Sequence, residues 1–321
     1  MKDFLQSIKL LIKQILKPDP FLLPIILVAA LFFLAVFDVY QKGEIILKST
    51  LNTPITNYKS SSYPFLKNKF NPNILAQGAI VVDKDSGVVI YAKNENLRFS
   101  PASTTKIMTA LVASEYYKQN SVLTVGSSAT TPGSKVGLNY GESLTFRALL
   151  YGMLLNSGND AAYTLAENYP GKTLGFVSAM NKKTMELNLT NTHFDNPAGF
   201  DSPNQYSSAE DLAKITEEAL KNYQLVKIFA TKETSIVSLN KKYTHQLFNL
   251  NKLLSSVSGV LGVKTGTTEA AKESLVTLVE RSGHRVLLVL LGSDDRFDET
   301  TRLIDWTYAN FNWPQIEIVQ R

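Results

Sequence analysis

The longest apolar run of the chain lies close to its N-terminus. Residues 21–37 contain no charged side chain, consist mainly of Leu, Ile, Phe and Ala, and are interrupted only by Pro24. This length is at the short end of what crosses a bilayer as a helix. Several lysines precede the run, whereas Lys42 and Lys48 are the only basic residues shortly after it. The pattern predicts a cytoplasmic segment at residues 1–20 and a transmembrane anchor at residues 21–37.

Other interpretations of this N-terminal region stay open. A cleaved signal peptide would need a small-residue cleavage site after the apolar run, and none follows. A buried core helix is the other alternative for residues 21–37. Within residues 1–20, apolar positions at helical spacing opposite lysines fit an amphipathic helix on the inner leaflet or a solvated start to the anchor. We expect an uncleaved signal anchor, with the rest of the chain outside the cytoplasmic membrane.

The pattern changes twice further along the chain. Residues 38–73 are polar and contain a serine run and several prolines, which predicts an extracytoplasmic linker. Two β-rich runs, 78–82 and 88–91, then flank an Asp- and Gly-containing turn and predict a hairpin. This hairpin begins a globular part that we place at residues 74–321.

Hydrophobic periodicity predicts the remaining elements of the globular part. Helices are expected from Ser103 through 112, across 144–168, and at 174–187, 208–220 and 299–311. Strands are expected at 263–265, 274–280 and 285–291. Because strands lie at both ends of this part and helices between them, the sequence predicts an α+β domain.

Composition narrows the possible chemistry. The 321 residues are 44% hydrophobic and 19% charged, which is ordinary for a globular protein. The absence of cysteine excludes disulfides and thiol nucleophiles, and three histidines without an H-E-x-x-H pair supply a metal centre or a Ser-His-Asp triad poorly. The net charge of +5 comes from scattered lysines. We therefore expect no metal, no cofactor and no nucleic-acid partner.

Three short polar motifs occur in a fixed order along the globular part. They are Ser103-Thr104-Thr105-Lys106, Ser157-Gly158-Asn159 and Lys264-Thr265-Gly266. Ser-x-x-Lys also occurs at Ser238, and Ser-x-Asn occurs again at Ser202 and Ser238, whereas Lys-Thr-Gly occurs once. Each motif is weak alone, so their order and long spacings carry the inference.

The first motif offers a nucleophile with a base beside it. Ser103 and Lys106 are three residues apart, so a helix would place them on one face. A serine hydroxyl needs a neighbour that removes its proton, and a lysine amine can do so only if burial or a nearby cation lowers its pKa. Lys264 could supply that cation. A serine at a helix start also lies beside free backbone N–H groups that suit an oxyanion hole, although Ser103 could simply be an N-cap.

The other two motifs suit substrate binding. Ser157 and Asn159 interrupt an apolar helical stretch, which is costly unless they face a cleft, where Ser157 could relay a proton and Asn159 could orient an amide. A local helix kink is the alternative. Lys264 with Thr265 could hold a carboxylate, and Gly266 would let a substrate backbone approach the strand. The alternative there is an ordinary strand ending in a turn.

From about residue 78 to residue 311 the chain resembles the low-molecular-mass penicillin-binding proteins of the serine D-alanyl-D-alanine carboxypeptidase family, and the three motifs form their signature. The matching segments are 101–110, 155–162, 196–199, 207–212 and 263–268. The resemblance implies a β-lactamase/transpeptidase-like fold, in which helices flank an antiparallel sheet and an all-helical subdomain is inserted. The implied substrate is a peptidoglycan stem peptide ending in D-Ala-D-Ala, and β-lactams are the implied acylating inhibitors.

The same resemblance implies a role for each motif residue. Ser103 is expected to be acylated, Lys106 to be its base and Ser157 to shuttle a proton. The N–H groups of Ser103 and Thr267 are expected to form the oxyanion hole. The implied substrate-binding residues are Asn159, Lys264, Thr265, Gly266 and Thr267.

The chain departs from its relatives at three places. Residues 271–274 read Ala-Lys-Glu-Ser where Ala-Gly-x-Cys is usual, so Lys272 puts the shape of that hairpin in question. Gln205 stands where a histidine is common. About 55 residues follow Lys264-Thr265-Gly266, enough to finish a catalytic domain but too few for the extra β-rich domain that many members carry.

Alternative functions remain at this point. A DD-endopeptidase would use the same residues, and a non-catalytic penicillin- or peptidoglycan-binding module could retain them. A β-lactamase would need a deacylating carboxylate, for which Glu186 in Glu186-Leu187-Asn188 is only a superficial match. The sequence favours a membrane-anchored carboxypeptidase.

Overall fold

The computed structural model describes residues 6–7, 9–10, 28–29, 31–42, 63–67 and 71–314. The chain divides into two units, Met1–Lys59 and Ser60–Arg321. In the first unit residues 31–42 are helical. Among the residues described, no helix combines the length and the apolar character needed to cross a bilayer. Most of the cytoplasmic segment, the start of the anchor and most of the linker lie outside the described residues, so these assignments stay predictions.

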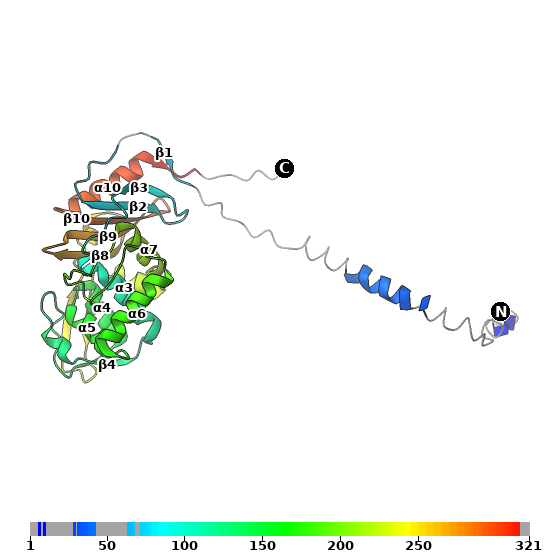
Figure 1. The fold of residues 1–321 in the computed structure, drawn as a ribbon, viewed down its shortest axis with the longest axis horizontal. Coiled ribbons are helices and arrows are strands. Elements are labelled where there is room, and N and C mark those ends of the chain that lie inside the picture. The colour runs from blue at the N-terminus through cyan, green and yellow to red at the C-terminus, as the bar shows by residue number, and fades with distance from the viewer. Residues whose placement is uncertain are drawn as a thin grey trace. The chain divides into compact units, whose positions relative to one another are not determined.

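The second unit is organised around a five-stranded antiparallel sheet with the strand order β3-β2-β10-β9-β8 (Figure 1). Its strands are β2 (Gly78–Asp83), β3 (Val89–Lys93), β8 (Val260–Thr268), β9 (Lys272–Arg281) and β10 (His284–Ser293). The predicted hairpin at 78–91 and the predicted strands near the C-terminus are confirmed, and each C-terminal strand is longer than expected. β8 lies at one edge of this sheet.

Two hydrophobic cores cover the two faces of the sheet. Successive strand residues point to opposite faces, so Ile80 and Leu287 enter one core whereas Val81 and Leu288 enter the other. This explains why the central strands are continuous apolar runs. The core that contains Val81 is closed by α10 (Arg296–Asn310). Beside α10, the short strands β1 (Phe65–Leu66) and β11 (Phe311–Asn312) pair with each other.

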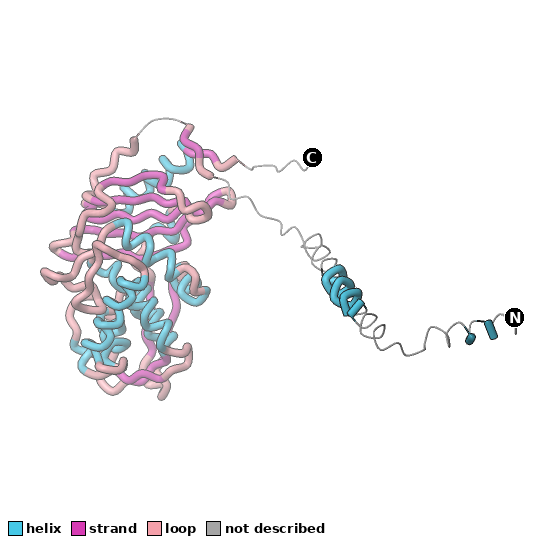
Figure 2. The backbone as a smooth tube through the Cα atoms, turned by 45° about the vertical axis from the view of Figure 1, so that its right-hand side comes forward, coloured by secondary structure: helices cyan, strands magenta, loops and turns pink. Residues whose placement is uncertain are grey.

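The chain between β3 and β8 carries most of the helices, which lie on the other face of the sheet (Figure 2), except that Leu253 and Leu254 of its last helix pack in the core that contains Val81. Its helices are η1 (Ala102–Thr105, a 3-10 helix), α3 (Lys106–Tyr116), η2 (Ser127–Thr130, also 3-10), α4 (Phe146–Leu155), α5 (Asn159–Glu167), α6 (Lys172–Glu186), α7 (Ala209–Ala219), α8 (Tyr223–Phe229) and α9 (Leu253–Ser256). The helices expected at 174–187 and 208–220 are confirmed as α6 and α7, and the one expected at 299–311 is confirmed as α10.

One prediction about this inserted part needs correction. It is not all-helical, because β4 (Val122–Thr124) pairs with β5 (Ser143–Thr145), and β6 (Glu233–Val237) pairs with β7 (Thr244–Phe248). These strands are short and half exposed, so their hydrophobic pattern is weak. The α+β class itself is confirmed.

The stretch 144–168 is largely helical, as predicted, and the kink that the sequence left open as the alternative is present. α4 ends at Leu155 and α5 begins at Asn159, and between them Ser157 has a positive φ of 56°. Gly158 allows the break to pack closely, because a Cβ there would lie 2.7 Å from Val136 Cγ2. The second motif lies at this break. The break is difficult to predict from the sequence because both helices are rich in apolar residues.

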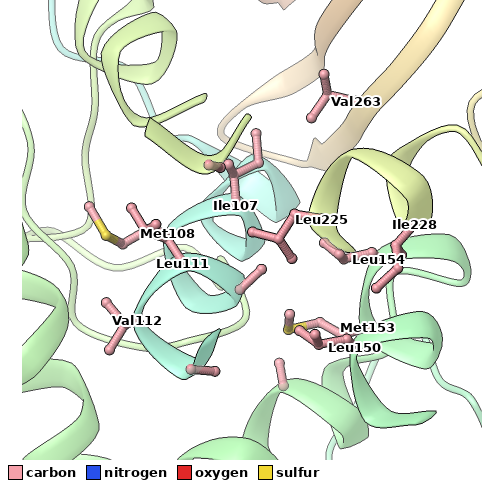
Figure 3. Close-up of a cluster of buried hydrophobic side chains, with 14 of the residues drawn as sticks. Ile107, Met108, Leu111, Val112, Leu150, Met153, Leu154, Leu225, Ile228 and Val263 are labelled. Carbon is pink, nitrogen blue, oxygen red and sulfur yellow. The ribbon is translucent and has the colours of Figure 1, made fainter. Parts of the chain in front are cut away.

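The larger core lies directly beneath the catalytic motifs. Figure 3 shows Ile107 and Leu111 of α3 gathered with Leu150 of α4, Leu225 of α8 and Val263 of β8. Ile107 follows Lys106 in the chain and Val263 precedes Lys264. Burial of these apolar neighbours therefore fixes the backbone from which both lysines project.

Candidate active site

The segment that carries Ser103 is a 3-10 turn rather than the start of an α-helix. Residues Ala102–Thr105 form η1, and α3 begins at Lys106. Ser103 is not a helix cap, because Pro101 and Thr105 occupy the cap positions and neither makes a side-chain capping hydrogen bond. The Ser103 hydroxyl instead accepts a hydrogen bond from Lys106 Nζ at 2.9 Å. The expected pairing of these two side chains is present.

Lys106 is completely buried and satisfied by three oxygen atoms. Besides Ser103 Oγ, its Nζ donates to Asn159 Oδ1 at 2.8 Å and to the carbonyl oxygen of Ala198 at 2.6 Å. Burial, followed by the nearby charge of Lys264, holds the pKa of Lys106 well below 10.5, although Asp160 opposes the shift. Burial and the nearby positive charge thus make Lys106 easier to deprotonate than a free lysine. Once neutral, Nζ keeps two hydrogens for Asn159 and Ala198, and its lone pair can accept the Ser103 hydroxyl proton.

The loop that supplies the Ala198 carbonyl is fixed by an asparagine that sequence reasoning assigned no role. Asn196 Oδ1 accepts hydrogen bonds from the N–H groups of Ala198 (3.2 Å), Gly199 (2.8 Å) and Phe200 (3.0 Å). Gly199 has a φ of 88°, and a Cβ there would lie 1.8 Å from the carbonyl oxygen of Ala102. Only glycine fits this contact between the loop and η1.

Gln205, one of the departures from the family pattern, supports the same loop. Its Oε1 accepts from the N–H groups of Asp195 (2.6 Å) and Asn196 (3.1 Å), and its Nε2 donates to Thr105 Oγ1 at 3.2 Å. The amide thus connects the loop to η1 without a histidine.

Ser157 and Lys264 form a second hydrogen-bonded pair. Lys264 Nζ donates to Ser157 Oγ at 3.0 Å and to the carbonyl oxygen of Thr265 at 2.9 Å. Both side chains are buried, at 3% and 2% exposure. The left-handed backbone of Ser157 in the break between α4 and α5 turns its hydroxyl towards β8.

Asn159 connects the first pair to an overlying loop. Its Oδ1 accepts from Lys106, and its Nδ2 donates to the carbonyl oxygen of Pro132 at 2.8 Å. The following residue, Asp160, is buried and accepts hydrogen bonds from the N–H groups of Val136 (3.0 Å) and Gly137 (2.9 Å). The start of α5 therefore anchors the loop that borders the site.

The third motif lies on the edge strand β8, where Gly266 permits a close approach to the nucleophile. A Cβ on Gly266 would lie 3.1 Å from Ala102 Cβ and 3.2 Å from the backbone nitrogen of Ser103. Gly266 and Thr267 are thus placed beside the segment that carries Ser103.

Arg296 belongs to this site and was missed from the sequence. It is the first residue of α10, and its Nη1 donates to the carbonyl oxygen of Gly266 at 2.7 Å and to Thr267 Oγ1. Burial and the charge of Arg296 together lower the pKa of Lys264 to about 7. No local motif marks Arg296, because only the fold brings the start of α10 to β8.

This value qualifies the sequence-based suggestion that Lys264 supplies a cation beside Lys106. Lys264 is protonated below about pH 7 and loses its charge above it. The charge of Lys264 lowers the pKa of Lys106, as like-charge repulsion predicts, but burial lowers that pKa more.

The alternative motif copies lie elsewhere. Ser238 follows β6, where its hydroxyl donates to Asn240 Oδ1 at 2.8 Å and accepts from the N–H group of Tyr243 at 2.9 Å. Ser202 bonds to Asp195. Glu186 ends α6 and pairs with Lys183 at 2.6 Å. Within the described part of the chain, no three His, Cys, Asp or Glu side chains gather into a possible metal site.

Chemically, the arrangement is a nucleophile flanked by two buried amines. Lys106 has a depressed pKa and touches the Ser103 hydroxyl, as a general base must. Lys264 and Arg296 place positive charge on the β8 side, where an anion could be held. A serine paired with a buried lysine, between an antiparallel sheet and a helical part, is typical of the serine penicillin-binding and transpeptidase class.

Comparison with known proteins gives the family. The model of the D-alanyl-D-alanine carboxypeptidase family, Peptidase_S11, matches residues 66–295. The chain belongs to this family.

Similar proteins agree with this assignment. The chain is 36% identical over 246 residues to D-alanyl-D-alanine carboxypeptidase DacF of Bacillus subtilis, covering 74% of this chain and 63% of that protein. It is also 36% identical to D-alanyl-D-alanine carboxypeptidase DacB2 of Mycobacterium tuberculosis, covering 74% of this chain and 84% of that protein. The crystal structure of the Streptomyces K15 DD-transpeptidase superposes with a TM-score of 0.71 at 33% identity, covering 75% of this chain and 99% of that one.

The charge state of Lys264 is directly testable. In protein with ¹⁵N-labelled lysine side chains, the Lys264 resonance should titrate with a midpoint near pH 7. Replacing Arg296 with Gln removes a positive charge that disfavours the ammonium, so the midpoint should move to higher pH.

Two variants complete this test. Lys264→Arg identifies the resonance, and Arg302→Gln, an exposed change further along α10, should leave the midpoint in place. A parent midpoint near the ordinary lysine value of 10.5 would contradict the electrostatic description of the site.

Proposed function

We propose that the chain is a serine D-Ala-D-Ala carboxypeptidase that trims peptidoglycan stem peptides through an acyl-enzyme on Ser103. The observation that carries this proposal is the 2.9 Å hydrogen bond between Ser103 Oγ and a buried Lys106 whose pKa is strongly lowered. Family membership supports the same substrate class. The chain spans only 63% of DacF, so the activity of the whole protein is inferred.

The two hydrogen-bonded pairs, Ser103 with Lys106 and Ser157 with Lys264, supply the groups needed for acylation. The neutral amine of Lys106 takes the hydroxyl proton as Ser103 Oγ attacks the carbonyl carbon between the two D-alanines. The backbone N–H groups of Ser103 and Thr267 stabilise the resulting oxyanion. When the C–N bond breaks, the leaving D-alanine amine receives a proton through Ser157. Water then hydrolyses the ester, with Lys106 again accepting a proton.

Substrate binding uses the β8 side of the site. Lys264, Thr265 and Arg296 would hold the terminal carboxylate, and Asn159 would orient the peptide through the second hydrogen of its amide. Gly266 keeps the strand open to the peptide backbone. The intact arrangement of nucleophile and base argues against the non-catalytic module, whereas a DD-endopeptidase would use the same residues.

β-Lactams fit the same site because their ring amide resembles the peptide bond. Glu186, the sequence-level candidate for a deacylating carboxylate, is paired with Lys183 on α6. Asp160 is engaged by backbone N–H groups. We therefore infer that the acyl-enzyme formed with penicillin is long-lived.

Incubation with a D-Ala-D-Ala peptide should release free D-alanine, and labelled penicillin should form a stable adduct on Ser103. Ser103→Ala should abolish both, because it removes the attacking oxygen. Ser238→Ala is the matched control and should retain both, since Ser238 lies in the turn after β6. Peptide mapping by mass spectrometry locates the adduct. An adduct on Ser238, or rapid penicillin turnover, would overturn this assignment.

We also propose that residues 21–37 anchor the protein in the cytoplasmic membrane, with residues 38–73 as a linker and the catalytic domain outside. The uncharged run and the lysines before it support this topology. Protease added to cells stripped of their outer layers should digest the domain and spare residues 1–20. Protection of the domain with digestion of the first residues would contradict it.

A further inference from the structure

Asp201 connects two segments that border the nucleophile. Its Oδ1 accepts hydrogen bonds from Ser100 Oγ at 2.6 Å and from Thr268 Oγ1 at 2.8 Å. Its Oδ2 accepts from the backbone N–H of Ala270 at 3.3 Å. One carboxylate therefore ties the segment just before Ser103 to the end of β8 and the turn that follows it.

The two segments pack against each other at Gly266 and Ala102, but beside Asp201 they leave an open space. A pocket of about 360 Å³, lined by Ser100, Asp201, Ser202, Pro203 and Ala270, borders the carboxylate. Asp201 forms no ion pair with any other described residue. Its side chain instead accepts hydrogen bonds from neutral donors, namely Ser100, Thr268 and the N–H of Ala270. The bridge across this open region is therefore made by hydrogen bonds.

The separation of the two segments matters for the proposed chemistry. Gly266 already lies close to the Ser103 nitrogen, and Thr267 follows it on β8. The two N–H groups proposed to stabilise the oxyanion come from Ser103 and Thr267, one from each segment. Donors of this kind act only if both lie within hydrogen-bond reach of one developing oxyanion. A change in the gap between the segments would therefore move one of these two N–H groups out of position.

We propose that Asp201 is a positioning residue that fixes this gap, so that the N–H groups of Ser103 and Thr267 converge on the same oxygen atom. This inference rests on the proposed acylation of Ser103. It concerns the transition state, because the oxyanion forms only when the carbonyl carbon is attacked. Asp201 itself does not touch the reacting atoms.

The test compares the acylation rate constant with the affinity of the initial complex, using labelled penicillin. Asp201→Ala should lower the rate constant about 10- to 100-fold, the size expected when a reacting geometry is slightly misplaced. The affinity of the initial complex and the pH dependence of the rate should stay unchanged, because Lys106 and Lys264 keep their hydrogen bonds. Asp201→Asn keeps an acceptor for both hydroxyls but points an NH₂ group at the Ala270 N–H, so its loss should be intermediate.

The partners provide an independent test if Asp201→Ala folds poorly. Combining Ser100→Ala with Thr268→Val should reproduce the loss, and adding Asp201→Ala to that pair should change the rate little, because the three side chains act together. Asp211→Asn is the matched control. That carboxylate also joins two segments, through Asn191 N and Thr192 Oγ1 at 2.8 Å each, but it contacts neither motif segment. It should lower the melting temperature without changing the acylation rate constant.

The outcomes separate the two proposals. A parent protein that penicillin and D-Ala-D-Ala peptides do not acylate would overturn the proposed function. If the parent is acylated and folded Asp201→Ala reacts at the same rate, the positioning role alone is overturned. A loss confined to the affinity of the initial complex would also contradict it.

Discussion

The candidate active site depends on the burial of two lysine side chains. Lys106 and Lys264 are both removed from water, and burial is the largest cause of the lowered pKa of each. A buried ammonium is costly unless it is hydrogen-bonded or loses its proton. Three oxygen atoms surround Lys106 and two surround Lys264, and the lowered pKa of each makes loss of the proton easier. The two lysines differ in their charged neighbours, because Lys264 further lowers the pKa of Lys106, whereas Arg296 helps to lower that of Lys264 to about 7.

The fold buries and hydrogen-bonds both lysines by bringing together segments that are far apart in the chain. The apolar core under Lys106 and Lys264 fixes α3 and β8, and the break between α4 and α5 brings Ser157 to Lys264. Two glycines allow the closest approaches, because Gly199 packs on Ala102 and Gly266 lies beside the Ser103 nitrogen. Helix α10 closes the opposite face of the sheet and also contributes Arg296. The elements that form the hydrophobic cores therefore also position the residues of the candidate active site.

The sequence predicted what short-range patterns encode. The motif residues, the α+β class and the long helices and strands could be read from spacing and periodicity. The break at Ser157 could be named only as an alternative, because α4 and α5 together form one apolar stretch. Arg296 and the Ala198 carbonyl were missed, since their roles come from contacts between segments far apart in the chain. The pKa of Lys264 depends on Arg296, so its charge state could not be predicted without the fold.

The central proposal is that Lys106 acts as the base that activates Ser103, while Lys264 supplies positive charge below about pH 7, where it is protonated. The most direct measurement is the rate of Ser103 acylation by labelled penicillin in folded Lys106→Ala and Lys264→Arg. Loss of a general base should slow Lys106→Ala by about 10²- to 10⁴-fold. Lys264→Arg keeps the charge with altered donor geometry and should retain measurable acylation. Near-parent acylation in Lys106→Ala, together with an inactive Lys264→Arg, would contradict the assignment of these roles.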